Sequence, residues 1–317
     1  TNDYHDMEKA IESICRQAAE AVDNDINYII LSDRKIDESR IAIPSLLAVS
    51  AVHNYLIEKH KRVQTALVVE AGDVREVMHF ALLLGYGASA VNPYLAMAVI
   101  DNLITTKELQ LDFKTAEYNY ITAVNKGLLK IISKMGISTL GSYKGAQLFD
   151  AVGVSNDFLS KYFCGTTSAI EGVGMEEIWR DVMRFHTQAF DCDAIDSLPN
   201  EGLLSFKKDG EYHAWNPQTI ARLQTSTRLG DYAKFKEFTS LVDDKTQYVF
   251  VHDLLDFKRG TAIDINEVEP VESIVKRFVA GAMSFGAISK EAHETIALAM
   301  NRLGGRSNTG EGGEDAE

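Results

Sequence analysis

The residues with the greatest potential for chemistry lie in a glycine-rich stretch near the carboxyl end of the chain. The stretch from Arg306 to Gly313 contains three glycines, and Ser307, Asn308, Thr309 and Glu311 add donors and acceptors. Glycine lets backbone N–H groups approach a ligand closely, so this loop could bind a polar or anionic group. It matches neither a phosphate P-loop nor a dinucleotide fingerprint. On its residues alone, a flexible polar tail is the alternative.

Two further polar groups follow predicted strands. Ser32-Asp-Arg34 comes directly after a strand at 27–31, and Ser142-Tyr-Lys144 follows one at 137–140. Open α/β sheets bind ligands at the carboxyl ends of their strands, so a freestanding α/β enzyme with a pocket there is one interpretation. The alternative is structural, because such aspartates and arginines often cap the next element or pair with each other.

The sequence contains no constellation of a histidine with a carboxylate or a cysteine that would indicate catalysis. His53 follows Val49 by one helical turn on a largely apolar face, so we expect it to be partly buried and hydrogen-bonded. The run from Gly85 to Ala90 matches G-x-G-x-x-A, but a helix precedes it and a strand follows, the reverse of a dinucleotide site. It predicts a helix-to-strand turn instead. A non-catalytic α/β scaffold or interaction module is therefore favoured over a freestanding enzyme.

The fold predicted to position these residues is α/β, a parallel sheet with flanking helices. Apolar runs alternate with amphipathic segments from residue 27 to 190, as in strand–helix–strand units. Strands are predicted at 27–31, 66–70, 88–92 and 137–140. Helices are predicted at 7–21, from Pro44 to Ile57, from a capping box at Asp73 to Leu84, and at 116–135, 146–152, 175–189, 217–223 and 232–241.

The glycine-rich loop is predicted to follow a strand and a helix. Residues 282–288 are uncharged and flanked by glycine, as a buried strand should be. Ser289 is suited to cap the next helix, and Gly304-Gly305 to end it. Apolar side chains recur at helical spacing between them, at Ile296, Ala299, Met300 and Leu303.

Composition narrows the class of protein. The net charge of −14 over 317 residues argues against nucleic acid or an anionic membrane surface as a partner. Cys15, Cys164 and Cys192 are far apart and lack metal-site spacing, which fits inert thiols in a reducing cytoplasm. Residues 81–100 carry no charge, but Gly85, Gly87 and Asn92-Pro93 interrupt them, so we predict no membrane span.

Two blocks of sequence resemble the large subunit of glutamate synthase. Gly-Ala-Met-Ser-Phe-Gly-Ala-Ile-Ser-Lys-Glu-Ala-His-Glu at 281–294 and Met-Asn-Arg-Leu-Gly-Gly-Arg-Ser-Asn-Thr-Gly-Glu-Gly-Gly-Glu-Asp at 300–315 look like the opening of its flavin-binding barrel. The segments at 30–34, 81–88, 91–96 and 133–147 are similar to its central domain, and 210–217 to the connection between the two.

The resemblance implies three parts. Residues 1–200 would be the central domain, related in fold to the barrel and lacking its start, and 201–270 a connector. Residues 271–317 would be the first strand and helix of a TIM-like FMN-binding (β/α)8 barrel. The implied activity, in glutamate biosynthesis and ammonia assimilation, is the formation of glutamate from glutamine and 2-oxoglutarate with reduced FMN and an iron–sulfur cluster. The implied partners are the amidotransferase and FMN/C-terminal domains of the same polypeptide and an electron-donor protein or subunit.

Residues of the implied flavin site are assigned by position in the motif. They are Met283, Ser284, Asn308, Thr309, Gly310 and Glu311. The resemblance assigns no catalytic residue and no metal ligand to this chain, because the amidotransferase nucleophile, the cluster cysteines and seven barrel strands have no counterpart in it. We therefore expect a fragment that is inactive alone and binds no cofactor. NADPH, NADH and ferredoxin all remain open as electron donor.

Overall fold

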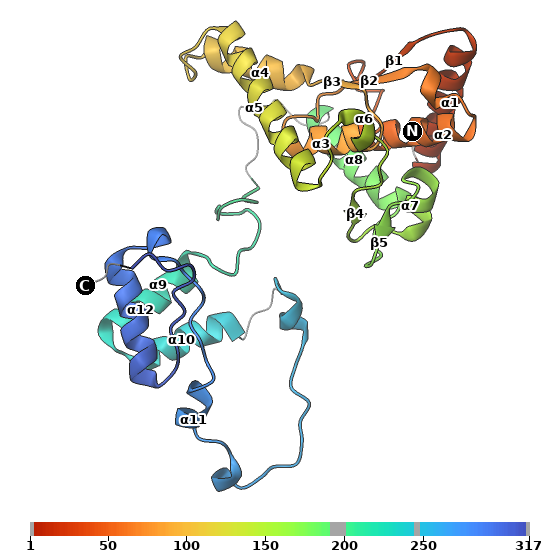
Figure 1. Ribbon diagram of the computed structural model, residues 1–317. Coiled ribbons are helices and arrows are strands. Elements are labelled where there is room, and N and C mark those ends of the chain that lie inside the picture. The colour runs from red at the N-terminus through yellow and green to blue at the C-terminus, as the bar shows by residue number, and fades with distance from the viewer. Residues whose placement is uncertain (1–2, 191–200, 244–247, 315–317) are drawn as a thin grey trace. The chain divides into compact units, whose positions relative to one another are not determined.

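The computed structural model describes residues 3–190, 201–243 and 248–314. The chain divides into two compact units, Thr1–Leu198 and Pro199–Glu317, and each is described by itself (Figure 1). No helix among the described residues is long and apolar enough to cross a membrane.

The first unit is built on a three-stranded parallel sheet. Strands β1 (Tyr28–Ser32), β2 (Ala66–Glu70) and β3 (Ala90–Asn92) lie in the order β1-β2-β3. β1 and β2 pair from Tyr28↔Ala66 to Ser32↔Glu70, and β2 continues to β3 through Glu70↔Asn92. The prediction of parallel neighbouring strands at these three places is confirmed, and with it the α/β fold class.

Helices bury one face of this sheet, as Figure 1 shows for the first unit. The helices of this unit, besides α6 (Leu140–Tyr143), are α1 (Tyr4–Asp23), α2 (Ser45–Glu58), α3 (Val77–Gly85), α4 (Tyr94–Thr105), α5 (Phe113–Lys134), α7 (Asn156–Tyr162) and α8 (Met175–Phe190). One apolar cluster includes Ile11 of α1, Leu56 of α2 and Leu67 of β2. A second includes Val69 of β2 and Leu83 of α3. Side chains on the other face of β1 are largely exposed.

The predicted strand at 137–140 is wrong. Thr139 instead caps the short helix α6 (Leu140–Tyr143), accepting a hydrogen bond from the Ser142 N–H at 3.2 Å. The Tyr143 ring is fully buried, and its hydroxyl donates to the Ala81 carbonyl of α3 at 3.1 Å. The buried aromatic ring thus fixes this segment as a helical turn against α3, where strand pairing was expected.

Two helix predictions also need correction. Residues 146–152 contain no helix; they lead into β4 (Asp150–Ala151), which pairs in parallel with β5 (Thr167–Ser168). Helix α3 begins after Glu76, in a capping box with His79, and not at Asp73. The Asp73 carboxylate accepts a hydrogen bond from Ser45 Oγ at 2.9 Å, so it is engaged at the start of α2.

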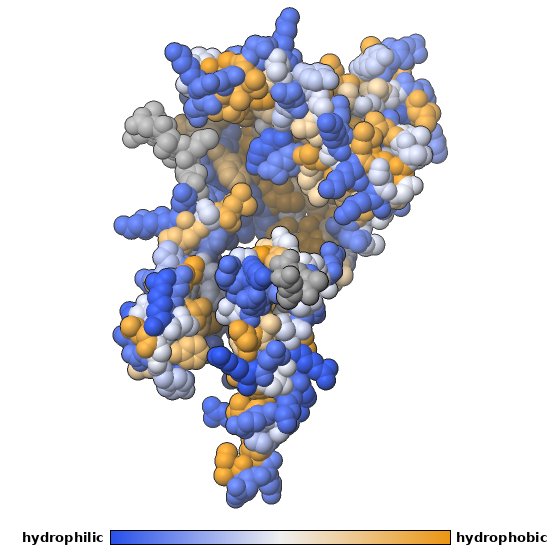
Figure 2. Space-filling view, turned by 60° about the vertical axis from the view of Figure 1, so that its left-hand side comes forward, coloured by the Kyte–Doolittle hydropathy of each residue, from blue (hydrophilic) through white to orange (hydrophobic). Residues whose placement is uncertain are grey.

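The second unit is helical with long connections. It contains α9 (Pro217–Leu229), α10 (Tyr232–Asp243), α11 (Val271–Val275), α12 (Lys290–Leu303) and the 3-10 turns η2 (Val251–Leu254), η3 (Ile265–Glu267) and η4 (Phe285–Ala287); η1 (Arg62–Gln64) is in the first unit. Figure 2 shows hydrophobic patches interspersed among hydrophilic residues on the surface.

The predicted strand at 282–288 is wrong, whereas the helix after it is confirmed. Ser289 caps α12 and Gly304 ends it in a left-handed conformation, as predicted. The segment before α12 contains the turn η4, and the parallel pairing lies a few residues earlier, in a single bridge between Val279 and Arg306. A strand needs a hydrogen-bonded neighbour, and among the described residues this bridge is the only such pairing in the segment.

Candidate functional site

The carboxyl ends of the three parallel strands carry a row of polar side chains. Ser32, Glu70 and Asn92 are register partners across the sheet. Ser32 Oγ donates to one oxygen of the Glu70 carboxylate at 2.7 Å, and Asn92 Nδ2 donates to the other at 3.2 Å. The row lies where α/β sheets place ligands, but its polar groups already bind one another.

The residues that follow β1 complete this network. Arg34 Nε lies 2.7 Å from Glu70 Oε1, and its guanidinium lies 4.2 Å from the centre of the Tyr94 ring. Hydrogen bonds from Ser32 and then Arg34 lower the pKa of Glu70. Asp33 Oδ2 accepts the Gly72 N–H at 2.8 Å, and burial, together with Asp33, raises the pKa of Tyr94 to about 12. These residues tie the three strand ends together, which supports the structural interpretation of Ser32-Asp-Arg34.

The second predicted group does not join the first. A cavity of about 610 Å³ is lined by Ser32 and Asp33, but Ser142-Tyr-Lys144 is not among its lining residues. Tyr143 is buried against α3, and Lys144 acts electrostatically on His53. The structure therefore does not assemble the shared pocket that a freestanding enzyme would need.

His53 is partly buried and hydrogen-bonded, as predicted. Its Nδ1 accepts from Arg62 Nε at 2.8 Å, and Arg62 also donates to the carbonyls of Thr65 and Gly87. Burial, followed by the charges of Arg62 and Lys144, lowers the pKa of His53 to about 4. A neutral imidazole that accepts from arginine fixes the turn after α3, so this histidine has a structural role.

In the second unit, the glycine-rich loop folds back onto the segment before α12. The Glu311 N–H donates to Ser284 Oγ at 3.3 Å. Gly310 has a φ of +66°, and a Cβ atom there would lie 3.1 Å from Ser284 Oγ and 3.2 Å from Ser284 N. Met283 is adjacent in sequence. The structure thus brings four of the six assigned residues together, namely Met283, Ser284, Gly310 and Glu311.

The other two assigned residues shape the loop. Asn308 Oδ1 accepts the Gly310 N–H at 3.0 Å, and the Thr309 carbonyl accepts the Gly312 N–H at 3.3 Å. Gly310, Gly312 and Gly313 all have positive φ, at 66°, 83° and 100°, which favours glycine over other residues. The N–H groups of Gly310, Glu311 and Gly312 thus bond within this segment, and the glycines give the loop its shape.

Sequence reasoning missed one neighbour of this loop. His293 Nε2 of α12 lies 3.0 Å from Glu314 Oε1, and the His293 ring packs edge-on against Phe285. His293 lies within the family-like segment at 281–294. Its position one helical turn after the N-cap Ser289 could have placed it near the loop. No group of three or more potential metal-ligating side chains occurs within the described part of the chain.

The first unit is an α/β unit with parallel strands, and in the second a glycine-rich loop folds back onto the segment before α12. Family comparisons then match both units. The family model described as "Glutamate synthase central domain" matches residues 1–155, and "Conserved region in glutamate synthase" matches residues 213–317. The chain belongs to the glutamate synthase family.

Similar proteins span three electron-donor types. Over 98% of its length the chain is 45% identical to the glutamate synthase [NADPH] large chain of Bacillus subtilis, covering 20% of it. It is 45% identical to the glutamate synthase [NADH] of Schizosaccharomyces pombe, covering 96% of this chain and 15% of that one. The chloroplastic ferredoxin-dependent glutamate synthase of Spinacia oleracea is 42% identical to the chain; the match covers 98% of this chain and 20% of the spinach protein. The chain thus spans about a fifth or less of the length of these relatives.

Proposed function

We propose that this chain acts as part of a glutamate synthase large chain, which forms glutamate from glutamine and 2-oxoglutarate in the cytoplasm. The central domain at 1–200 and the connector at 201–270 would link an amidotransferase domain to the flavin barrel that begins at 271–317. The observation that carries the proposal is the return of the loop at 307–313 onto Ser284. That arrangement joins two segments of the family motif into one surface.

Met283, Ser284, Asn308, Thr309, Gly310 and Glu311 would form one side of an FMN site. Their donor groups fit a polar ring edge, because Ser284 Oγ and the backbone of the glycine loop lie together. When bound, FMN supplies the hydride for the reductive step. The remaining walls, an iron–sulfur cluster and the entry of electrons from a donor protein or subunit belong to the rest of the large chain. Residues 1–317 alone would be inactive.

The proposal is tested by a chimera of the Bacillus subtilis relative in which the matching segment is replaced by residues 1–317. We expect glutamine-dependent glutamate formation within about tenfold of the parent enzyme, because the replaced segment is 45% identical. A matched chimera with Gly310→Val should lose about a hundredfold or more, because the new side chain would collide with Ser284. A folded chimera that forms no glutamate would refute the proposal.

A further inference from the structure

Strand β1 has one unpaired edge. In the sheet order β1-β2-β3, β2 is its only partner among the described residues. The ladder starts with the Ala66 N–H donating to the Asn27 carbonyl and ends with the Asp33 N–H donating to the Glu70 carbonyl. Backbone groups alternate in direction along a strand, so the N–H and C=O groups of Tyr28, Ile30 and Ser32 face away from β2. They form a regular row of donors and acceptors.

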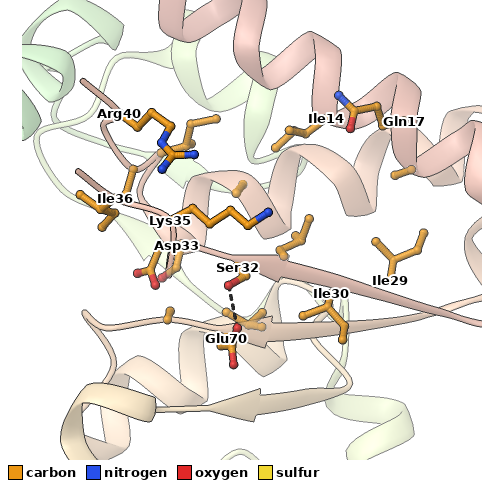
Figure 3. Close-up of a pocket in the computed structure, with 18 of the residues that line it drawn as sticks. Ile14, Gln17, Ile29, Ile30, Ser32, Asp33, Lys35, Ile36, Arg40 and Glu70 are labelled. Carbon is orange, nitrogen blue, oxygen red and sulfur yellow. Dashed lines mark hydrogen bonds between the residues drawn. The ribbon is translucent and has the colours of Figure 1, made fainter. Parts of the chain in front are cut away.

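A groove of about 610 Å³ follows this strand. Ile29, Ile30, Leu31 and Ser32 line it from β1, and Ile14, Gln17, Ala18 and Ala21 line it from one stripe of α1. Figure 3 shows the groove between β1 and α1, with Ile14 and Gln17 across from Ile29. Side chains of α1 and of β1 therefore line opposite sides of this groove.

One cation in this groove has no partner. Lys35 lines the cavity, and Figure 3 shows its side chain reaching into the space between β1 and α1. It forms no hydrogen bond or ion pair with any residue that the structure describes. Arg40 also lines the groove, but Asp37 binds its guanidinium, with Nε 2.8 Å from Oδ2. The groove thus combines an apolar wall, a row of backbone groups and a free ammonium.

We propose that β1 receives a fourth strand in this groove, an extended apolar segment carrying a carboxylate for Lys35. Strand addition uses such an edge, with backbone hydrogen bonds for affinity and side-chain pockets for specificity. Tyr28 and Ile30 are 71% and 63% exposed, so their side chains have room for neighbours on an added strand. The source of the strand is a part of the same large chain outside residues 1–317, since the relatives are about five times as long. Only this choice of source rests on the proposed function.

Hydrogen exchange on the purified chain tests the edge itself. The amides of Ile29, Leu31 and Asp33 should exchange slowly, and those of Tyr28, Ile30 and Ser32 at least tenfold faster, because only the first set is bonded to β2. Equal protection of both sets would mean that the edge is already paired, and would overturn the proposal.

A pair of proline variants sharpens this test. Ile30→Pro removes an N–H that faces the groove, whereas Leu31→Pro removes one bonded to β2. In the purified chain Leu31→Pro should lower the Tm by about 6–12 °C, and Ile30→Pro by much less. In the full-length chimera both should destabilise, because there the Ile30 N–H is also bonded. If Ile30→Pro leaves the full-length protein as stable as the parent, no strand docks at this edge.

Photo-cross-linking in the full-length chimera identifies the occupant. A benzophenone side chain replaces Tyr28, and a control replaces Val63, which is 96% exposed and lies outside the groove. We expect a cross-link from position 28 alone, to a segment of the same polypeptide outside the inserted residues, and its loss with Lys35→Glu. A cross-link to a second copy, or none, would overturn the proposal. If the chimera forms glutamate without this cross-link, the docked strand is refuted and the proposed function stands. If the cross-link forms but no glutamate is made, the docked strand stands and the proposed function is refuted.

Discussion

At the scale of single residues, the tightest constraint lies where α3 turns into β3. Gly87 has a φ of +114°, and a Cβ atom there would lie 2.2 Å from His53 Nδ1. The same imidazole accepts from Arg62, whose guanidinium also donates to the Gly87 carbonyl. The turn was predictable from the glycine pair, but its dependence on His53 and Arg62 was not, because those contacts join residues from separate elements.

We expect Gly87→Ala to destabilise the protein by about 3 kcal/mol or more, because strained backbone and a steric collision add. Gly136→Ala is the matched control: its φ is +71°, and open space surrounds the position. Gly136→Ala should lower the free energy of unfolding by about 1 kcal/mol, because only backbone strain is added. Urea unfolding measures both, and equal losses would show that the His53 contact is not rigid.

The low pKa of His53 predicts a pH dependence of stability. The folded value is about 4 against 6.5 for an ordinary histidine, so between these pH values the unfolded chain binds more protons. Stability conferred by the neutral ring is complete above about pH 6.5 and declines as the pH falls towards 4. The loss should be on the order of 2 kcal/mol, a figure reduced for partial exposure.

Thermal unfolding from pH 7 to pH 4 checks this dependence. His53→Gln should flatten the decline in Tm that this group contributes, because glutamine can accept from Arg62 without titrating. His60→Asn is the control, since His60 is exposed with a φ of 59°, which asparagine tolerates. An unchanged profile in His53→Gln would contradict the assignment.

At the scale of elements, the three strands of the main sheet were predictable, whereas the short pair β4 and β5 was not. The runs at 27–31 and 66–70 are apolar and lie between turn residues, and both form the sheet. The run at 137–140 forms no strand, because Thr139 caps a helical turn and Tyr143 is buried against α3. Local pattern could not reveal that tertiary contact. The loop at 307–313 was assigned from the family motif, and the structure adds its contact with Ser284.

We expect the burial of Tyr143 to hold this helical turn in place. Tyr143→Ala should cost about 3–5 kcal/mol through the cavity left behind, and Tyr143→Phe about 1 kcal/mol through the lost hydrogen bond to Ala81. Tyr118→Ala, at an exposed position of α5, is the control and should cost less than about 1 kcal/mol. A similar loss of unfolding free energy in Tyr143→Ala and Tyr118→Ala would mean that the ring does not anchor the turn.

At the scale of the whole molecule, the proposed flavin site is divided between this chain and the rest of the large chain. Ser284 and the loop at 307–313 form one surface, but the relatives with which the chain shares its sequence are about five times as long. FMN binding draws on its phosphate, ribityl chain and ring together. Losing about 4 kcal/mol of those contacts weakens binding by about a thousandfold.

The flavin content of two purified proteins tests this claim most directly. Residues 1–317 alone should be colourless and bind no FMN at micromolar concentrations. The full-length chimera should carry about one FMN per chain by its visible absorbance, and Gly310→Val should reduce that content. A yellow preparation of residues 1–317 with stoichiometric FMN would contradict the account, because the flavin site would then be complete within this chain.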